Sequence, residues 1–160
     1  MQEKSPPQNP PRRFAQADSV LEQHKQLRVL LDEIAATLAG TPAGAEGPAW
    51  LARLAAGLGD LRPQLQAHFD HEEAQGLFEE IEGSLPEAAE DCTRLRGEHQ
   101  SLVAEVGEIQ RQVGAGGGAE DGAQALTRRV HALLETLARH EALEDDLLFR
   151  ALEGGISAQD

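Results

Sequence analysis

The sequence predicts an all-α protein, an up-down-up-down four-helix bundle with an internal two-fold repeat of a helix pair. Leu and Ala dominate the 160 residues, while Tyr is absent and Trp and Met occur once each. This composition favours helices packed through aliphatic side chains over β-sheet. Apolar residues recur at helical spacing in four segments. Short connections rich in Gly and Pro join these segments, which predicts antiparallel neighbours.

The first two helices are expected to begin at Ser19 and near residue 49. The Ser19 hydroxyl can cap its own first turn while Glu22 reaches back to the backbone. This helix ends near Gly40, and its apolar positions have helical spacing: Val20, Leu27, Leu31, Ile34 and Leu38. The second helix spans about 49–81 and stops at Gly83. A kink or local break is expected near residue 60, where three helix-weakening residues cluster: Gly57, Gly59 and Pro63.

The third and fourth helices are expected to begin at Ser84 and near residue 121. Ser84 and Glu87 form a second capping pattern, and the helix ends at Gly114. The fourth helix spans about 121–153, where Gly154 can close it. Four helices with short connections predict the up-down-up-down order.

Composition and charge exclude several classes of protein. One domain is expected at 18–155, between a Pro-rich flexible segment at 1–17 and a flexible tail at 156–160. The formal net charge of -14 opposes binding to nucleic acid. No segment looks like a signal peptide or a membrane span, so we expect a cytoplasmic protein. The single cysteine, Cys92, cannot form an internal disulfide and is expected to be an ordinary buried residue.

The two halves of the chain resemble each other. An alignment pairs residues of the first half with equivalents in the second: His24 with His99, His68 with His140, Glu72 with Glu144, and Glu73 with Asp145. The Leu77-Phe78 and Leu148-Phe149 steps match after a one-residue slip. This repeat predicts a bundle with a pseudo-two-fold axis.

Four histidines and two glutamates at equivalent places in the halves are candidate metal ligands. Each half has a His-Glu pair spaced four residues apart and a lone histidine upstream of it. The spacing of four places both side chains of a pair on one helix face, so four helices can direct all six at one interior point. A single such pair is usually solvated, but its recurrence favours a metal centre. The set is His24, His68, Glu72, His99, His140 and Glu144.

Counting residues along the helices places the histidines at one height. His68 lies 15 residues before Gly83, and His99 lies 15 after Ser84, a rise of about 22 Å on each helix. The counts for His24 and His140 give the same level within about one turn. The first helix is short beyond this layer, so residues 6–17, which include Phe14, are expected to lie across that open end of the bundle.

Imidazole and carboxylate donors without thiolate suit iron, manganese or zinc, and the oxygen ligands favour iron. Two histidines per metal, two bridging glutamates and one bridging oxide or hydroxide give about five ligands to each metal, which leaves a sixth octahedral position open. The sequence therefore predicts a di-iron centre, bridged by oxide or hydroxide and by carboxylates, that binds dioxygen, nitric oxide or peroxide. Iron handling is a close variant of this function.

These motifs resemble the hemerythrin-like, or HHE cation-binding, family. The resemblance covers about residues 18–153 and is carried by four segments: Glu22 to Leu27, His68-Phe-Asp-His-Glu-Glu through Phe78, Glu98 to Leu102, and His140 through Phe149. It implies a non-haem di-iron centre that binds dioxygen or related small molecules. The ligands that it implies are His24, His68, Glu72, His99, His140 and Glu144.

Two positions depart from the pattern of the family's oxygen carriers. Val103 stands where those carriers have a second histidine one turn after the third-helix ligand, which argues against reversible oxygen carriage. The carriers use an aspartate five residues after the last histidine, where this chain offers both Glu144 and Asp145. The internal repeat favours Glu144.

Several other residues have alternative interpretations. His71, three residues after His68, could be a further ligand or an outer residue, and a position on the flank is favoured. His131 is expected to face solvent. Three aromatic residues could line a small-molecule pocket or simply fill the core: Phe69, Phe78 and Phe149.

Two other functions fit the same residues. A peroxidase or oxidase would use the same open coordination positions of the metals, but the sequence indicates no catalytic acid, base or substrate pocket beyond the ligands. The second alternative function is that of an acidic helical interaction module, either metal-free or stabilised by zinc. Turnover with peroxide would favour the enzyme, while unchanged structure and spectra on replacing Glu72 and Glu144 by Gln would favour the module.

Overall fold

The described part of the chain is helical and contains no β-strand. This computed structural model describes residues 14–40, 47–117 and 122–157. They form α1 (Ala17–Ala39), α2 (Gly47–Gln75), α3 (Leu77–Ser84), a 3-10 turn (Pro86–Ala88), α4 (Ala89–Gly114) and α5 (Gly122–Ser157). The all-α prediction is confirmed. Residues 1–13 of the predicted N-terminal segment and 158–160 of the predicted tail lie outside the described residues.

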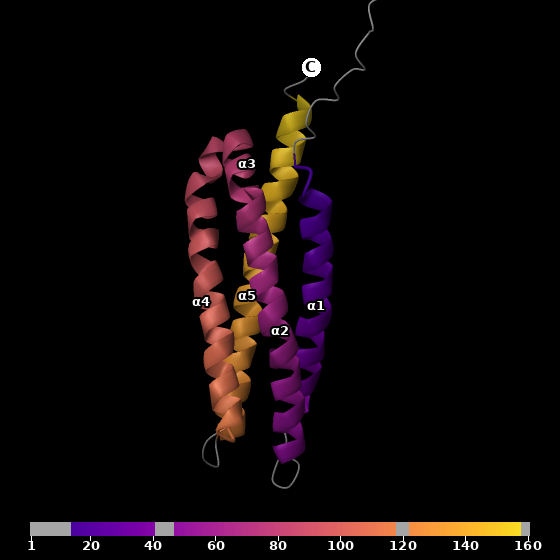
Figure 1. The fold of residues 1–160 in the computed structure, drawn as a ribbon, viewed down its shortest axis with the longest axis vertical. Coiled ribbons are helices and arrows are strands. Elements are labelled where there is room, and N and C mark those ends of the chain that lie inside the picture. The colour runs from indigo at the N-terminus through magenta and orange to yellow at the C-terminus, as the bar shows by residue number, and fades with distance from the viewer. Residues whose placement is uncertain (1–13, 41–46, 118–121, 158–160) are drawn as a thin grey trace, which may run out of the picture.

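The four long helices lie side by side with nearly parallel axes, and α3 sits at one end of them (Figure 1). α1 contacts α2 and α5, and α4 contacts the same two helices, so the four surround a shared interior. α3 packs at its end against α2, α4 and α5. No described helix has the length and apolarity needed to cross a membrane. Side chains from four distant segments of the sequence therefore meet between the long helices.

α2 continues unbroken past residue 60, and the expected local break does not occur there. Gly57 instead permits close packing of α2 on α1, because a Cβ at this position would lie 2.9 Å from Ile34 Cγ1. The break comes at Gly76, which has φ 69° and ψ 35°, in the left-handed region that favours glycine. Gly76 is an extra residue relative to the second half, and it explains the one-residue slip between the two Leu-Phe steps.

Both predicted N-terminal helix caps, Ser19 and Ser84, are wrong. α1 begins at Ala17 with Gln16 at the N-cap and no capping side chain. Phe14 is 5% exposed and its carbonyl accepts a hydrogen bond from Ala17 N–H, so burial of an aromatic ring sets the start of this helix. Ser84 ends α3 instead of opening α4, because the 3-10 turn comes between them and α4 begins only at Ala89.

Two apolar clusters fill the interior, one on each side of a polar layer. The Trp50 cluster contains Trp50, Phe69 and the aliphatic side chains around them from α1, α2, α4 and α5. The Phe14 cluster contains Phe14, Phe78 and neighbours from α1, α3, α4 and α5. Each fully buried Leu contributes about 1.5–3 kcal/mol of transfer free energy. On α1, Val20 belongs to the Phe14 cluster and Leu27 to the Trp50 cluster, with His24 between them.

Candidate metal centre

Six buried polar side chains form the layer between the Trp50 cluster and the Phe14 cluster. None of them is more than 4% exposed, and side chains of these types are seldom so buried without partners. All four long helices supply them: His24 from α1, His68 and Glu72 from α2, His99 from α4, and His140 and Glu144 from α5. The structure thus brings together every residue that the sequence singled out as a metal ligand.

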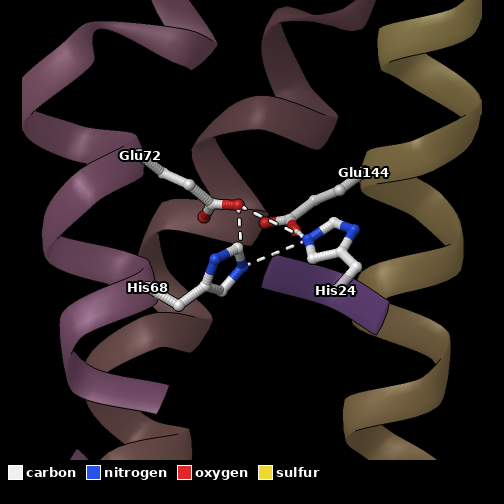
Figure 2. A group of neighbouring side chains, drawn as sticks. All are labelled: His24, His68, Glu72 and Glu144. Carbon is white, nitrogen blue, oxygen red and sulfur yellow. Dashed lines mark hydrogen bonds and ion pairs between the residues drawn. The ribbon is translucent and has the colours of Figure 1, made fainter. Parts of the chain in front are cut away.

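His24 and His68 form the first half of the layer with one oxygen of each glutamate (Figure 2). The two Nε2 atoms lie 3.1 Å apart. Glu72 Oε1 lies 2.9 Å from His68 Nε2 and 3.6 Å from His24 Nε2. Glu144 Oε2 lies 3.1 Å from His24 Nε2. Two imidazole nitrogens and two carboxylate oxygens therefore face one point.

His99 and His140 form the second half with the remaining oxygens of the same two glutamates. Glu144 Oε1 lies 2.8 Å from His140 Nε2 and 3.6 Å from His99 Nε2. Glu72 Oε2 lies 3.4 Å from His99 Nε2. The planes of the two imidazole rings are inclined at 58°, with their centroids 5.2 Å apart. This half offers the same kinds of donor atom as the first.

Each glutamate divides its carboxylate between the two histidine pairs. Glu72 directs Oε1 to His24 and His68 and Oε2 to His99, while Glu144 directs Oε2 to His24 and Oε1 to the other pair. Two groups of these side chains could each hold a metal ion: His24, His68, Glu72 and Glu144, and His99, His140 and Glu144. A carboxylate placed between two such groups can bind both metals at once.

Several donor atoms in this layer have no hydrogen-bond partner among the described residues. They are both carboxylate oxygens of Glu72 and Glu144 and the Nε2 atoms of His99 and His140. A buried polar atom without a partner costs about 1–3 kcal/mol, and more if the group is charged. Imidazole nitrogens and carboxylate oxygens that converge in this way fit a cation.

The other ring nitrogen of each histidine, Nδ1, faces the outside of the layer. An acceptor there holds the Nδ1 proton and leaves the Nε2 lone pair directed inward. The acceptors are Asp145 Oδ1 for His24 at 2.7 Å, Gln23 Oε1 for His68 at 2.8 Å, Glu73 Oε1 for His99 at 2.9 Å and Glu98 Oε2 for His140 at 2.7 Å. All four rings are therefore oriented by a hydrogen bond at Nδ1.

Comparison with known protein families identifies this arrangement. The model of the hemerythrin HHE cation binding domain matches residues 16–152. The chain belongs to this family. The searches of curated proteins and of solved structures found no match. The matched range of this hemerythrin-like domain contains all six buried side chains of the layer, and binding of a metal cation agrees with their donor atoms.

Close contacts between imidazoles and carboxylates shift pKa values in opposite directions in the hemerythrin-like domain. Burial alone would lower the pKa of His24, but its contacts with Asp145, Glu144 and Glu72 raise the pKa to about 11. Burial alone would raise the pKa of Glu144, but the nearby imidazoles of His140, His24 and His99 hold it well below the usual range. Imidazolium and carboxylate forms thus stabilise each other. A metal cation competes with these protons for the same donor atoms.

The residues for which the sequence analysis gave alternative roles lie at different positions in the hemerythrin-like domain. Asp145 lies outside the layer, where Oδ1 accepts from His24 and Oδ2 accepts from Arg28 Nη2 at 2.8 Å. His71 also lies outside, with its Nε2 3.4 Å from Ser19 Oγ. His131 is exposed, as predicted. Glu144, and not Asp145, therefore supplies the carboxylate inside the layer.

Two of the three aromatic residues pack on a histidine of the site, and the third is exposed to solvent. Phe69 stacks on His99 with the ring centroids 3.9 Å apart and the planes inclined at 5°. Phe78 contacts the same ring at a centroid distance of 5.5 Å. Phe149 is 53% exposed, so its interpretation as a residue that lines an interior pocket or fills the core is wrong. Phe149 lies on the solvent-facing surface of α5.

The sequence reasoning missed the residues that orient the histidines and one further buried acid. Each Nδ1 acceptor is the chain neighbour of a candidate ligand, a signal that was available in the sequence. Glu141, beside His140, is 5% exposed and lies 3.4 Å from Arg28 Nε. Burial raises the pKa of Glu141. Its position next to a ligand gave no indication of whether it would face inward.

Proposed function

We propose that this hemerythrin-like protein holds a non-haem di-iron centre and binds dioxygen, nitric oxide or peroxide. His24 and His68 would hold one iron, His99 and His140 the other, and Glu72 and Glu144 would bridge the pair. The observation that carries the proposal is that each of these two carboxylates divides its oxygens between the histidine pairs. One metal ion would use only half of these donors.

The donor types favour iron over metals bound through sulfur. Cys92 is fully buried within the Phe14 cluster, and burial raises the pKa of its thiol to about 11, so a thiolate ligand is not available. Two imidazoles and one oxygen from each glutamate give about four protein donors to each iron, and a bridging oxide or hydroxide adds a fifth. When bound, the iron pair supplies electron-transfer chemistry and an open coordination position for a small molecule.

The residues around the donors prepare them for this role. Nδ1 of every histidine has an acceptor, which directs Nε2 toward the metal positions. Apolar clusters on both sides of the layer exclude water from it. We also infer that the long helices follow the up-down-up-down order, and that an approximate two-fold axis relates α1 and α2 to α4 and α5. The equivalent places of the two histidine pairs support this repeat.

The test is the metal content and optical spectrum of protein purified in air from iron-replete cells. We expect about two irons per chain and near-ultraviolet charge-transfer bands that bleach on anaerobic reduction. Glu72→Gln and Glu144→Gln should each lose at least one iron per chain. Glu33→Gln changes an exposed glutamate of α1 and should retain both. His71→Gln is a stricter control, because this histidine lies close to the site but outside the layer.

Each alternative function predicts a different result in the same experiment. A zinc-stabilised module would contain zinc and no visible charge-transfer band, and a metal-free module would keep its structure in the double Gln variant. Sustained turnover of peroxide would indicate a peroxidase, whereas spectral changes that reverse when the gas is removed would indicate binding or sensing. An iron-free wild-type protein would refute the di-iron proposal.

A further inference from the structure

The outer partners of the four histidines follow the internal repeat at two positions. His24 Nδ1 donates to Asp145, the residue after Glu144, at 2.7 Å. His99 Nδ1 donates to Glu73, the residue after Glu72, at 2.9 Å. Both acceptors are carboxylates, so the two upstream histidines have chemically equivalent partners.

The repeat fails at the other two positions. Gln23 precedes His24 and accepts from His68 Nδ1 at 2.8 Å, whereas Glu98 precedes His99 and accepts from His140 Nδ1 at 2.7 Å. The two acceptors occupy the same place and make the same bond. One is a neutral amide and the other is a carboxylate, so the halves of the site differ by one charge at otherwise matched positions.

One of the four acceptors also pairs with a cation. Asp145 Oδ2 pairs with Arg28 Nη2 at 2.8 Å, and Arg28 Nε also lies 3.4 Å from the buried Glu141. Glu73 and Glu98 form no ion pair with Lys or Arg in the described part of the chain. The difference between the two positions that the matched bonds carry is therefore the amide of Gln23 against the carboxylate of Glu98.

A carboxylate that accepts from Nδ1–H makes an imidazole a stronger electron donor to a metal on Nε2 than an amide does. We propose that Gln23 makes the two metal positions unequal, so that the His99–His140 position stabilises ferric iron more strongly than the His24–His68 position. Gln23 acts through His68 and is a positioning residue. This inference rests on the proposed di-iron centre.

The inference predicts two separate one-electron reductions of the diferric protein. In each step one ferric ion takes up one electron from dithionite through redox mediators and becomes ferrous. The ion at the His24–His68 position is reduced at the higher potential, because an amide and not a carboxylate accepts from Nδ1 of one of its histidines. The ion at the His99–His140 position is reduced at the lower potential.

Two reciprocal substitutions and a matched control test this assignment in the full chain. Gln23→Glu places a carboxylate behind His68 and should shift the higher potential downward, with a smaller effect on the lower one. Glu98→Gln places an amide behind His140 and should shift the lower potential upward. Both variants should reduce the difference between the two reduction potentials. Gln26→Glu adds the same charge at an exposed position on α1 and should move both potentials less.

The outcomes separate this inference from the proposed function. Iron analysis precedes the redox titration, and a wild-type protein without two irons would refute the di-iron centre itself. With two irons present, equal shifts of both potentials in Gln23→Glu, or an unchanged separation in both variants, would overturn the inference. If Gln23→Glu does not fold, as judged by its helical circular dichroism, Glu98→Gln decides the question through the lower potential alone.

Discussion

Asp145 accepts a hydrogen bond from His24 Nδ1–H at 2.7 Å, across 121 residues of sequence. The bond joins the first long helix to the last, and the same carboxylate also pairs with Arg28 of the first helix at 2.8 Å. One side chain thus orients a candidate ligand and fastens α1 to α5.

Replacement of Asp145 should therefore weaken the fold before any metal is added. We expect Asp145→Ala to lower the free energy of unfolding of the metal-free protein by about 2 kcal/mol, because it leaves His24 Nδ1–H without an acceptor. Urea denaturation followed by circular dichroism measures this loss. Asp146→Ala is the matched control, since it makes the same helix substitution at an exposed residue that forms an ion pair with Arg150 and lies away from the layer. Equal stability of the two variants would contradict the prediction.

Stability of the metal-free protein should fall as the pH rises above neutrality. The folded-state pKa of His24 is about 11, against about 6.5 in the unfolded chain. The folded state therefore binds more protons between these values, and the contribution of His24, complete below about pH 6.5, is lost as the pH approaches 11. Urea midpoints after chelation, at about pH 6 and about pH 9, test this trend. His24→Gln should reduce the dependence of the urea midpoint on pH. An equal dependence in this variant and in the wild type would show that other groups cause it.

Acid should destabilise the metal-free protein through the opposite kind of shift. The pKa of Glu144 lies well below its usual 4.5 because the imidazoles of three histidines lie close to its carboxylate. Its contribution is therefore complete above about pH 4.5 and is lost as the pH falls through the lower folded-state value. Glu144→Gln should remove this part of the acid transition in urea denaturation between about pH 5 and about pH 3. Glu33→Gln should leave the transition as it is in the wild type.

Two glycines near the site should respond in opposite directions to alanine. Gly76 has φ 69°, so Gly76→Ala places a Cβ in the left-handed region and should cost about 1 kcal/mol. Gly83 lies in α3, where an added Cβ meets nothing within 4 Å, so Gly83→Ala should stabilise by about 0.5–1 kcal/mol. Thermal unfolding of both variants measures the difference. A stabilised Gly76→Ala would mean that the turn between α2 and α3 can adopt another conformation.

Metal removal should lower stability because the six buried side chains bind the cation only when they are assembled. At a free metal concentration of 100 times Kd, binding adds about 2.7 kcal/mol to the free energy of unfolding. Calorimetry of loaded and chelated protein should show this as a higher midpoint of the loaded form. His99→Ala with His140→Ala should abolish most of the increase. His131→Ala, at an exposed histidine, should retain it.

Side-chain periodicity was sufficient to predict the four long helices and the layer of six buried residues, but not α3 as a separate helix. Apolar residues at helical spacing mark the inward face, and His24, His68 and His99 occur on the same face. The internal repeat also distinguished Glu144 from Asp145, since it pairs Glu144 with Glu72. These predictions succeed because helix geometry fixes which side chains share a face.

Helix ends were harder to predict because tertiary contacts decide them. Ser19 has the residue type of a cap, yet burial of Phe14 starts α1 earlier. Pro63 and two glycines indicated a break, yet α2 continues and the break falls at Gly76. The Nδ1 acceptors could have been found as chain neighbours of the candidate ligands, but the sequence does not show which histidine each one contacts. Gln23, for example, accepts from His68 of another helix and not from its neighbour His24.

The distribution of the six side chains over α1, α2, α4 and α5 has a consequence for protein synthesis. Because α5 is made last and supplies His140 and Glu144, a nascent chain carries only part of the donor set until that helix emerges from the ribosome. A metal ion captured earlier would be held by an incomplete group of ligands and would exchange readily. Stable metal binding is therefore expected only after α5 has emerged and packed against the other three long helices.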